Sequence, residues 1–266
     1  MRFFISILFL SLIFSNDVKG INKHQIGIFA PYKYQLTDEI EVSTHPIAFA
    51  AIPNISARIK HNKKFVDFIF ENSNADTSMN NNNNSFFTTH SIYIPTTLFN
   101  MLKREGMGGV ISPELDDFPF MISLKNEVEI FIEREPYEIS IKTGISFGYS
   151  AKNIDTRSTI DLPIIFPRMQ MYYSESNYNL NYYLGIRRNI TKRLDVFSNI
   201  NGLVYPKSDN KFFVENKSLL IWKYSKNTEI QMGYKLVYGE YPFGNMVHLL
   251  PFSIMPFPLI DIVWTW

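Results

Sequence analysis

The sequence predicts an all-β protein, an antiparallel transmembrane β-barrel of about 12 to 16 strands with one short helical insertion. This prediction rests on long segments of alternating apolar and polar residues, on repeated polar turns, and on an N-terminal segment typical of secretion. The chain has 266 residues, no cysteine and a net charge of +1. The nearly neutral charge argues against a nucleic-acid partner, and the lack of cysteine excludes disulfides and thiolate metal sites.

Several segments alternate over the length of a transmembrane strand. Side chains of a strand point alternately to the two faces of the sheet. In residues 138–149, one face is apolar and the other carries Lys142 with glycine and serine, and residues 178–187 and 228–239 repeat this pattern. These segments are about ten residues or longer, whereas strands of ordinary soluble sheets average about five or six. The residues expected to face lipid are Ile139, Ile141, Phe147, Ile230, Tyr234, Leu236, Ile262 and Trp264.

Polar turns separate the strands. Residues 36–42, 124–130 and 190–196 share one pattern, in which a strand end, a short polar turn and a strand start follow one another. We expect these tight turns on one rim of the barrel. Longer polar connections are expected on the opposite rim, at residues 206–211, at 240–245, and at 71–85 with its asparagine run.

Residues 1–20 predict a signal peptide. Arg2 precedes an apolar run of roughly 12 residues, which is too short for a spanning helix of about 20 residues. Cleavage is expected after Gly20, with Ser15 as the alternative site. Residues 21–266 would then form a single barrel domain.

Residues 96–117 depart from the strand pattern. A short helix is expected to start at Thr96 or Thr97 and to stop at Gly106, because threonine caps helices and glycine ends them. The acidic loop that follows leads to two readings. The segment is either a helical insertion at the rim or a plug that partly fills the lumen.

Taken together, the signal sequence, the alternating strands, the repeated turns and the terminal Trp266 resemble the outer-membrane β-barrel proteins of Gram-negative bacteria. Residues 34–54 are similar to uncharacterised bacterial barrel-like proteins. The resemblance implies a location in the bacterial outer membrane, with outer-membrane lipid and the barrel-assembly machinery as partners. The final strand, with Ile262, Trp264 and Trp266 on one face, is similar to the C-terminal assembly signal that this machinery reads.

Chemical motifs are sparse. The chain has no HExxH, CxxC, GxSxG or glycine-rich phosphate loop, so we expect no catalytic residue, metal or cofactor. The expected function is a porin-like channel for small solutes, or a structural surface role on the same scaffold. The alternatives are an outer-membrane lipid or peptide hydrolase that uses His45 or His90, and a soluble extracytoplasmic β-rich protein.

The candidate site is the inner wall of the barrel. An acidic stripe on one strand face suggests either a cation path or ordinary salt bridges within the lumen. The lumen-lining candidates are His45, Glu127, Glu129, Glu133, Lys142, Asn181, Arg187, Gln231 and Lys235.

Overall fold

The computed structural model describes residues 24–49, 52–61, 83–102, 119–152, 159–162, 169–172, 178–206, 212–241, 244–245 and 255–266. Within these ranges, 12 antiparallel strands form a closed barrel, as expected from the sequence. The signal peptide predicted for residues 1–20 lies outside the described residues, as do residues 103–118 of the region predicted to be an insertion or plug.

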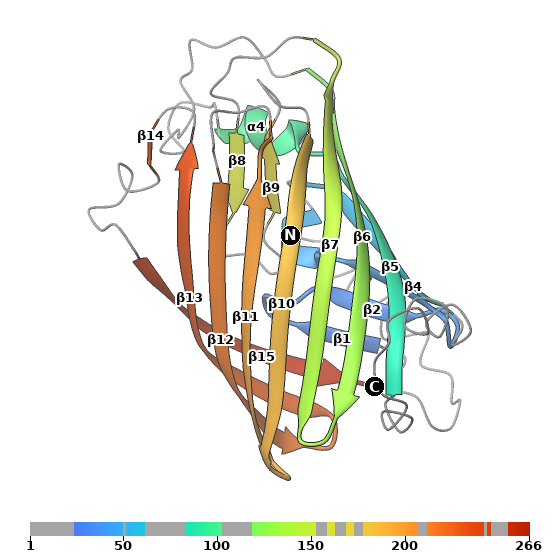
Figure 1. Cartoon of the computed structure of the whole chain (residues 1–266). Coiled ribbons are helices and arrows are strands. Elements are labelled where there is room, and N and C mark those ends of the chain that lie inside the picture. The colour runs from blue at the N-terminus through green and yellow to red at the C-terminus, as the bar shows by residue number, and fades with distance from the viewer. Residues whose placement is uncertain are drawn as a thin grey trace, which may run out of the picture.

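Each barrel strand pairs with its neighbours in chain order, and the last strand closes the ring by pairing with the first (Figure 1). The barrel strands are β1 (His24–Gly27), β2 (Tyr32–Gln35), β3 (Ile40–Thr44), β4 (Asn54–His61), β5 (Asn83–Tyr93), β6 (Met121–Arg134), β7 (Tyr137–Ser150), β10 (Tyr178–Thr191), β11 (Leu194–Val204), β12 (Phe212–Ser225), β13 (Thr228–Tyr241) and β15 (Met255–Thr265).

The elements outside the barrel wall are short. Strands β8 (Thr159–Leu162) and β9 (Met169–Tyr172) form a separate hairpin, and β14 (Gly244–Asn245) pairs with the end of β13. Helix α4 (Thr96–Leu102) starts at the expected residue, and the Thr96 hydroxyl accepts a 2.8 Å hydrogen bond from the backbone N–H of Met121. A shorter helix, α2 (Pro46–Phe49), was not anticipated from the sequence. Among the described residues, no helix has the length and apolar character needed to cross a membrane.

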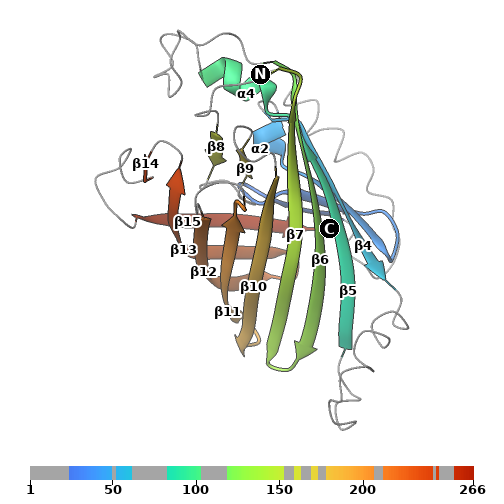
Figure 2. The same ribbon diagram turned by 45° about the horizontal axis from the view of Figure 1, so that its top comes forward.

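The two rims of the barrel differ. Tight turns join β2 to β3, β6 to β7, β10 to β11 and β12 to β13 at one rim. Figures 1 and 2 show α4, β8 and β9 at the opposite rim. This asymmetry, with short turns on one side and longer connections on the other, is typical of outer-membrane barrels.

Two of the expected turns and loops are placed differently by the structure. Residues 124–130 lie inside β6, because their polar side chains are the inward positions of one long strand whose outward positions remain mostly apolar. The asparagine run was expected opposite the tight turns. However, β4 ends at His61 and β5 begins at Asn83 at the rim of the tight turns, so residues 62–82 connect strands on that rim.

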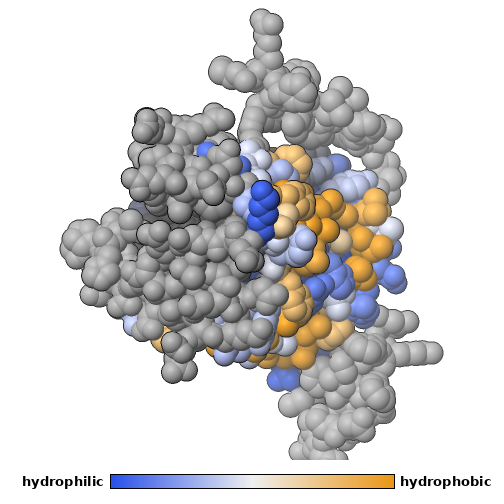
Figure 3. Space-filling view, turned by 90° about the horizontal axis from the view of Figure 1, so that it is seen from above, coloured by the Kyte–Doolittle hydropathy of each residue, from blue (hydrophilic) through white to orange (hydrophobic). Residues whose placement is uncertain are grey.

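The barrel is apolar outside and polar inside. Ile130, Ile141 and Leu184 lie side by side on the outer face of β6, β7 and β10, where Ile130 is half-buried and the other two side chains are exposed. The residues between them in each strand point inward, and many of these are charged. Seen from above, apolar residues cover much of the outer surface that is coloured in Figure 3. This arrangement reverses that of a water-soluble sheet protein and suits a wall bathed in hydrocarbon.

Candidate functional site: the charged interior

A buried glutamate links the inner faces of several strands. The carboxylate of Glu129 on β6 lies 2.9 Å from Nη2 of Arg58 on β4 and 3.4 Å from Nζ of Lys142 on β7. The hydroxyl of Ser140 donates a 2.6 Å hydrogen bond to its other oxygen. The residue Glu129 is only 4% exposed. We refer to Arg58, Glu129, Ser140 and Lys142 as the Glu129 cluster.

Aromatic rings support both cations of this cluster. The guanidinium carbon of Arg58 lies 3.4 Å from the ring centroid of Phe87 on β5, the strand over which Arg58 reaches to Glu129. The Nζ of Lys142 lies 5.0 Å from the ring centroid of Tyr183 on β10. Such cation–π contacts orient the two charges as well as stabilising them. The Glu129 cluster is therefore held in place by β4 to β7 and by β10.

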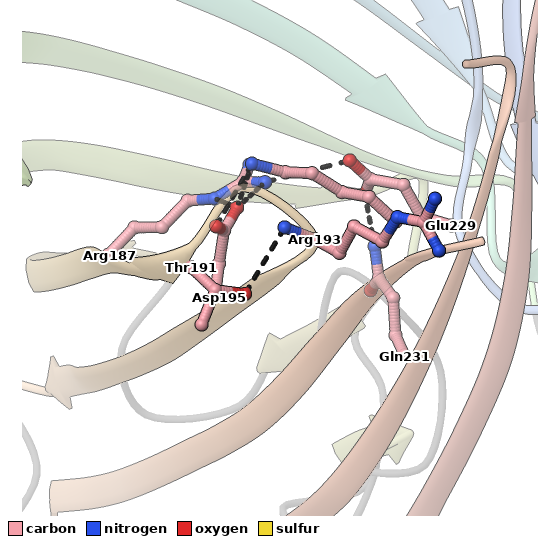
Figure 4. Close-up of polar contacts among 7 residues, drawn as sticks. Arg187, Thr191, Arg193, Asp195, Glu229 and Gln231 are labelled. Atoms are coloured by element: carbon pink, nitrogen blue, oxygen red, sulfur yellow. Dashed lines mark hydrogen bonds and ion pairs between the residues drawn. The ribbon is translucent and has the colours of Figure 1, made fainter. Parts of the chain in front are cut away.

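A second charged group lies near the rim of tight turns. Asp195 on β11 is fully buried and accepts hydrogen bonds of 2.9 Å from Nε of Arg187 and from Nζ of Lys223. Arg187 also lies 3.5 Å from Glu229, and the Gln231 amide donates to that carboxylate at 3.4 Å. Figure 4 shows Arg187 and Asp195 pointing toward each other, with Glu229 and Gln231 beside them. We refer to Arg187, Asp195, Lys223 and Glu229 as the Asp195 cluster.

A third group contains two lysines on adjacent strands. Lys217 on β12 and Lys235 on β13 are direct cross-strand partners on the inner face. Lys235 is 1% exposed and lies 3.2 Å from a carboxylate oxygen of Glu215. Lys217 interacts electrostatically with Lys142 and Lys33, which come from distant strands. These lysines therefore face a common volume inside the barrel.

The structure places most of the predicted lumen residues on the inner face. Glu129 and Lys142 meet directly, and Arg187 and Gln231 meet through Glu229. Glu127 forms a 2.7 Å ion pair with Lys125 on its own strand. Elsewhere on the wall, Asn181 donates to the Ser146 hydroxyl, and Glu133 stands opposite Glu138 near the rim.

The two histidines considered for catalysis, His45 and His90, lie in different parts of the structure. His45 lies between β3 and α2, is 1% exposed, and its Nε2 donates a 2.7 Å hydrogen bond to the carbonyl of Phe29. Burial lowers the pKa of His45, which favours its neutral form. His90 points outward from β5, with Nδ1 2.8 Å from the side-chain oxygen of Asn126. His45 therefore packs between the loops at the rim opposite the tight turns, and His90 lies on the outer surface.

Sequence reasoning missed Arg58, Asp195 and Lys217. Each lies at a polar position of a segment in which apolar and polar residues alternate, as the predicted lumen residues do. The alternation could therefore have identified all three as inward-facing. Their partners, however, lie on other strands, and only strand register shows which charges meet. Across the described ranges, no group of three or more histidine, aspartate or glutamate side chains could hold a metal ion.

Comparison with known proteins finds only distant similarity, to solved structures of other outer-membrane proteins. No family model matches the chain, and no curated protein matches it. Among solved structures, the chain is similar to outer-membrane expressed OmpT of Vibrio cholerae, with a TM-score of 0.45 and 8% identity over 91% of this chain and 64% of that chain. It is also similar to the outer membrane channel DcaP of Acinetobacter baumannii, with a TM-score of 0.37 and 10% identity over 95% of this chain and 66% of that chain. This chain thus spans less than two thirds of the length of OmpT. The closed antiparallel barrel of this chain is itself the fold expected from the sequence.

Proposed function

We propose that this barrel is a narrow porin-like channel that passes small polar or charged solutes across the outer membrane. The observation that carries this proposal is the Glu129 cluster, in which charges from β4, β6 and β7 meet inside the barrel. Removing charges from water is costly. Well-packed apolar side chains in the interior would therefore often give the barrel as much stability as buried ion pairs, or more. A charged interior instead suits solutes that must exchange water for protein contacts.

The packing of the interior supports a narrow passage. Glu129, Asp195 and Lys235 are almost fully buried although they point inward, so side chains crowd the interior around them. We therefore expect a small unitary conductance with gating as ion pairs exchange partners. Basic and acidic groups both line the wall, and this mixture predicts weak ion selectivity.

The test is the conductance of the full-length mature protein in a planar bilayer. Discrete current steps are expected, and Glu129→Gln should shift the reversal potential toward anion preference, because it removes a negative charge from the passage. Ile130→Val, on the outer face of the same strand, is the matched control and should leave the reversal potential unchanged. A correctly folded barrel that stays electrically silent would contradict the channel.

A further inference from the structure

The cations and the carboxylate of the Glu129 cluster differ in how much of each side chain is exposed. The side chains of Arg58 and Lys142 are 29% and 28% exposed, whereas that of Glu129 is 5% exposed. All three point inward, so the exposed surface of the two cations faces the interior of the barrel. A solute inside the barrel therefore meets positive charge at this cluster, with the carboxylate hidden behind it.

Both oxygens of the Glu129 carboxylate already have partners. Its Oε1 accepts the hydrogen bond from Ser140, and its Oε2 accepts one from Nε of Arg58 at 3.0 Å. Nη2 of Arg58 and Nζ of Lys142 lie 2.9 and 3.4 Å from the same Oε2. The carboxylate therefore has little left to offer a solute, and two cations share one of its oxygens.

The two cations keep donors that Glu129 does not use. In the part of the chain that the structure describes, Nη1 of Arg58 bonds to no protein group, and Lys142 forms an ion pair with Glu129 alone. A guanidinium carries five N–H donors and an ammonium carries three. Because both cations lie beside one oxygen of Glu129, a single carboxylate arriving from the interior can contact both.

Nearby carboxylates are paired with other cations. Glu127 lies 2.7 Å from Nζ of Lys125, and Glu41, on the strand beside β4, lies 3.7 Å from Nζ of Lys33. Each of these pairs is neutral. The Glu129 cluster, by contrast, contains two cations and one carboxylate, so it carries an excess positive charge.

Aromatic rings hold the two cations without neutralising them. The ring of Phe87 lies against the guanidinium of Arg58, and the ring of Tyr183 lies near the ammonium of Lys142. An aromatic ring attracts a cation through its quadrupole and has no net charge. Side chains that are already held in place lose less conformational entropy when a ligand binds. The cluster is thus prepared to receive an anion.

The Asp195 cluster offers no such excess. Its two cations, Arg187 and Lys223, are balanced by two carboxylates, those of Asp195 and Glu229. The side chain of Glu229 is 28% exposed, as is that of Arg187. Positive and negative charge are both accessible there, so an anion should prefer the Glu129 cluster.

We propose that the Glu129 cluster binds small solutes that carry a carboxylate, which Arg58 and Lys142 contact from the interior side. This inference rests on the proposed channel function and names its substrate class. Charge-assisted hydrogen bonds to two cations favour a carboxylate over a neutral or cationic solute of similar size. Simple salt ions do not need these contacts, so selectivity among them remains weak.

Protection of Arg58 from phenylglyoxal, which modifies arginine side chains, tests the site in the folded full-length mature protein in lipid nanodiscs. Modified residues are mapped by mass spectrometry at constant ionic strength. Glycerate should protect Arg58 saturably, whereas glycerol and choline, which are neutral and cationic, should not. Arg193 in an exposed turn should be modified equally in every case. Lack of modification at Arg58, or equal protection by choline, would overturn the proposal.

Variants of Lys142 test its contact with the solute. Lys142→Gln should raise the glycerate concentration that gives half protection by about tenfold, because one charge-assisted hydrogen bond is lost. Lys142→Arg keeps the positive charge and should restore most of the affinity. Lys226→Gln in an exposed turn is the matched control, and heat-dependent gel mobility shows that each variant is folded. An unchanged concentration for half protection in Lys142→Gln would contradict the proposed contact.

Current recordings with the same anion separate the site from the channel. Glycerate should interrupt the current steps carried by potassium chloride in a planar bilayer, and Lys142→Gln should shorten these interruptions. If current flows but glycerate neither protects Arg58 nor interrupts the current, this inference fails and the channel remains. If glycerate protects Arg58 and the bilayer stays silent, the site remains and the channel fails.

Discussion

His24 and Trp266 join the two ends of the barrel wall. Their backbones exchange hydrogen bonds of 2.9 and 3.0 Å, and their rings stack with centroids 5.4 Å apart and planes 11° apart. The His24 ring also lies 4.9 Å from that of Tyr34, and its Nδ1 is 2.8 Å from the Tyr32 hydroxyl. Trp266 therefore helps to hold β1 and β15 together, the two strands whose pairing closes the barrel.

Loss of the terminal aromatic ring should weaken this seam. We expect Trp266→Ala to lower the free energy of unfolding by about 1–2 kcal/mol, because ring stacking and the packing around it are lost. Urea unfolding in lipid vesicles measures the change. Trp266→Phe keeps an aromatic ring at the same position and should recover most of the loss. Equal destabilisation by both variants would show that stacking does not hold the seam.

A charge on the outer wall should be poorly tolerated. Ile141 is flanked by Ile130 and Leu184 on the lipid-facing surface, so Ile141→Arg should destabilise the assembled barrel by about 2–4 kcal/mol. Ile141→Val preserves the apolar surface and is the control. The readout is the urea midpoint of protein folded into vesicles. If the arginine variant is as stable as the valine variant, this face does not contact hydrocarbon.

The Asp195 cluster should contribute to stability through its single buried carboxylate. Asp195→Asn leaves Arg187 and Lys223 without their shared negative partner. Because those two side chains are about one-third exposed, water compensates for part of the loss. We expect a cost of about 1–3 kcal/mol in unfolding free energy. Arg193→Gln, in the exposed turn nearby, should cost much less, and a reversed order would contradict this role for Asp195.

His45 should make stability depend on pH. Burial lowers its pKa in the folded barrel, whereas in the unfolded chain the pKa is about 6.5. The unfolded state therefore takes up a proton first, and the contribution of neutral His45 is lost as the pH falls below about 6.5. Unfolding midpoints measured from pH 7.5 down to the folded-state pKa should decline for the wild type. His45→Gln should flatten this decline, and identical profiles would rule out His45 as its source.

The structure also revises one expectation about Lys142. From the sequence alone, Lys142→Ser is expected to be nearly neutral, because the residue faces a wet lumen. Its Nζ, however, lies 3.4 Å from the buried Glu129 carboxylate, so the substitution should destabilise the Glu129 cluster. Arg58 continues to neutralise the carboxylate, which limits the expected cost to about 1 kcal/mol. The urea midpoint of Lys142→Ser checks this value against that of Lys60→Ser on an exposed strand end.

The sequence by itself determined the faces of the strands. Ile141 and Lys142, or Ile262 and Asp261, fall on opposite sides because the side-chain period of a strand is two, a local property that needs no partner. Alternation over such lengths, with tight turns at one end, was therefore enough to predict a closed antiparallel barrel.

Only the tertiary structure decided which inward-facing residues meet and how long each strand of the barrel is. Arg58 reaches Glu129 across β5 because of strand register, which here depends on pairing between β4, β5 and β6, strands joined by long connections. The same pairing shows that residues 124–130 lie inside β6, and that the connection from β4 to β5 lies at the rim of the tight turns. Pairing between strands also limits β1, β2 and β3 to 4, 4 and 5 residues. The alternation within one strand does not contain this information, because hydrogen bonds between strands set the register and decide where each strand ends.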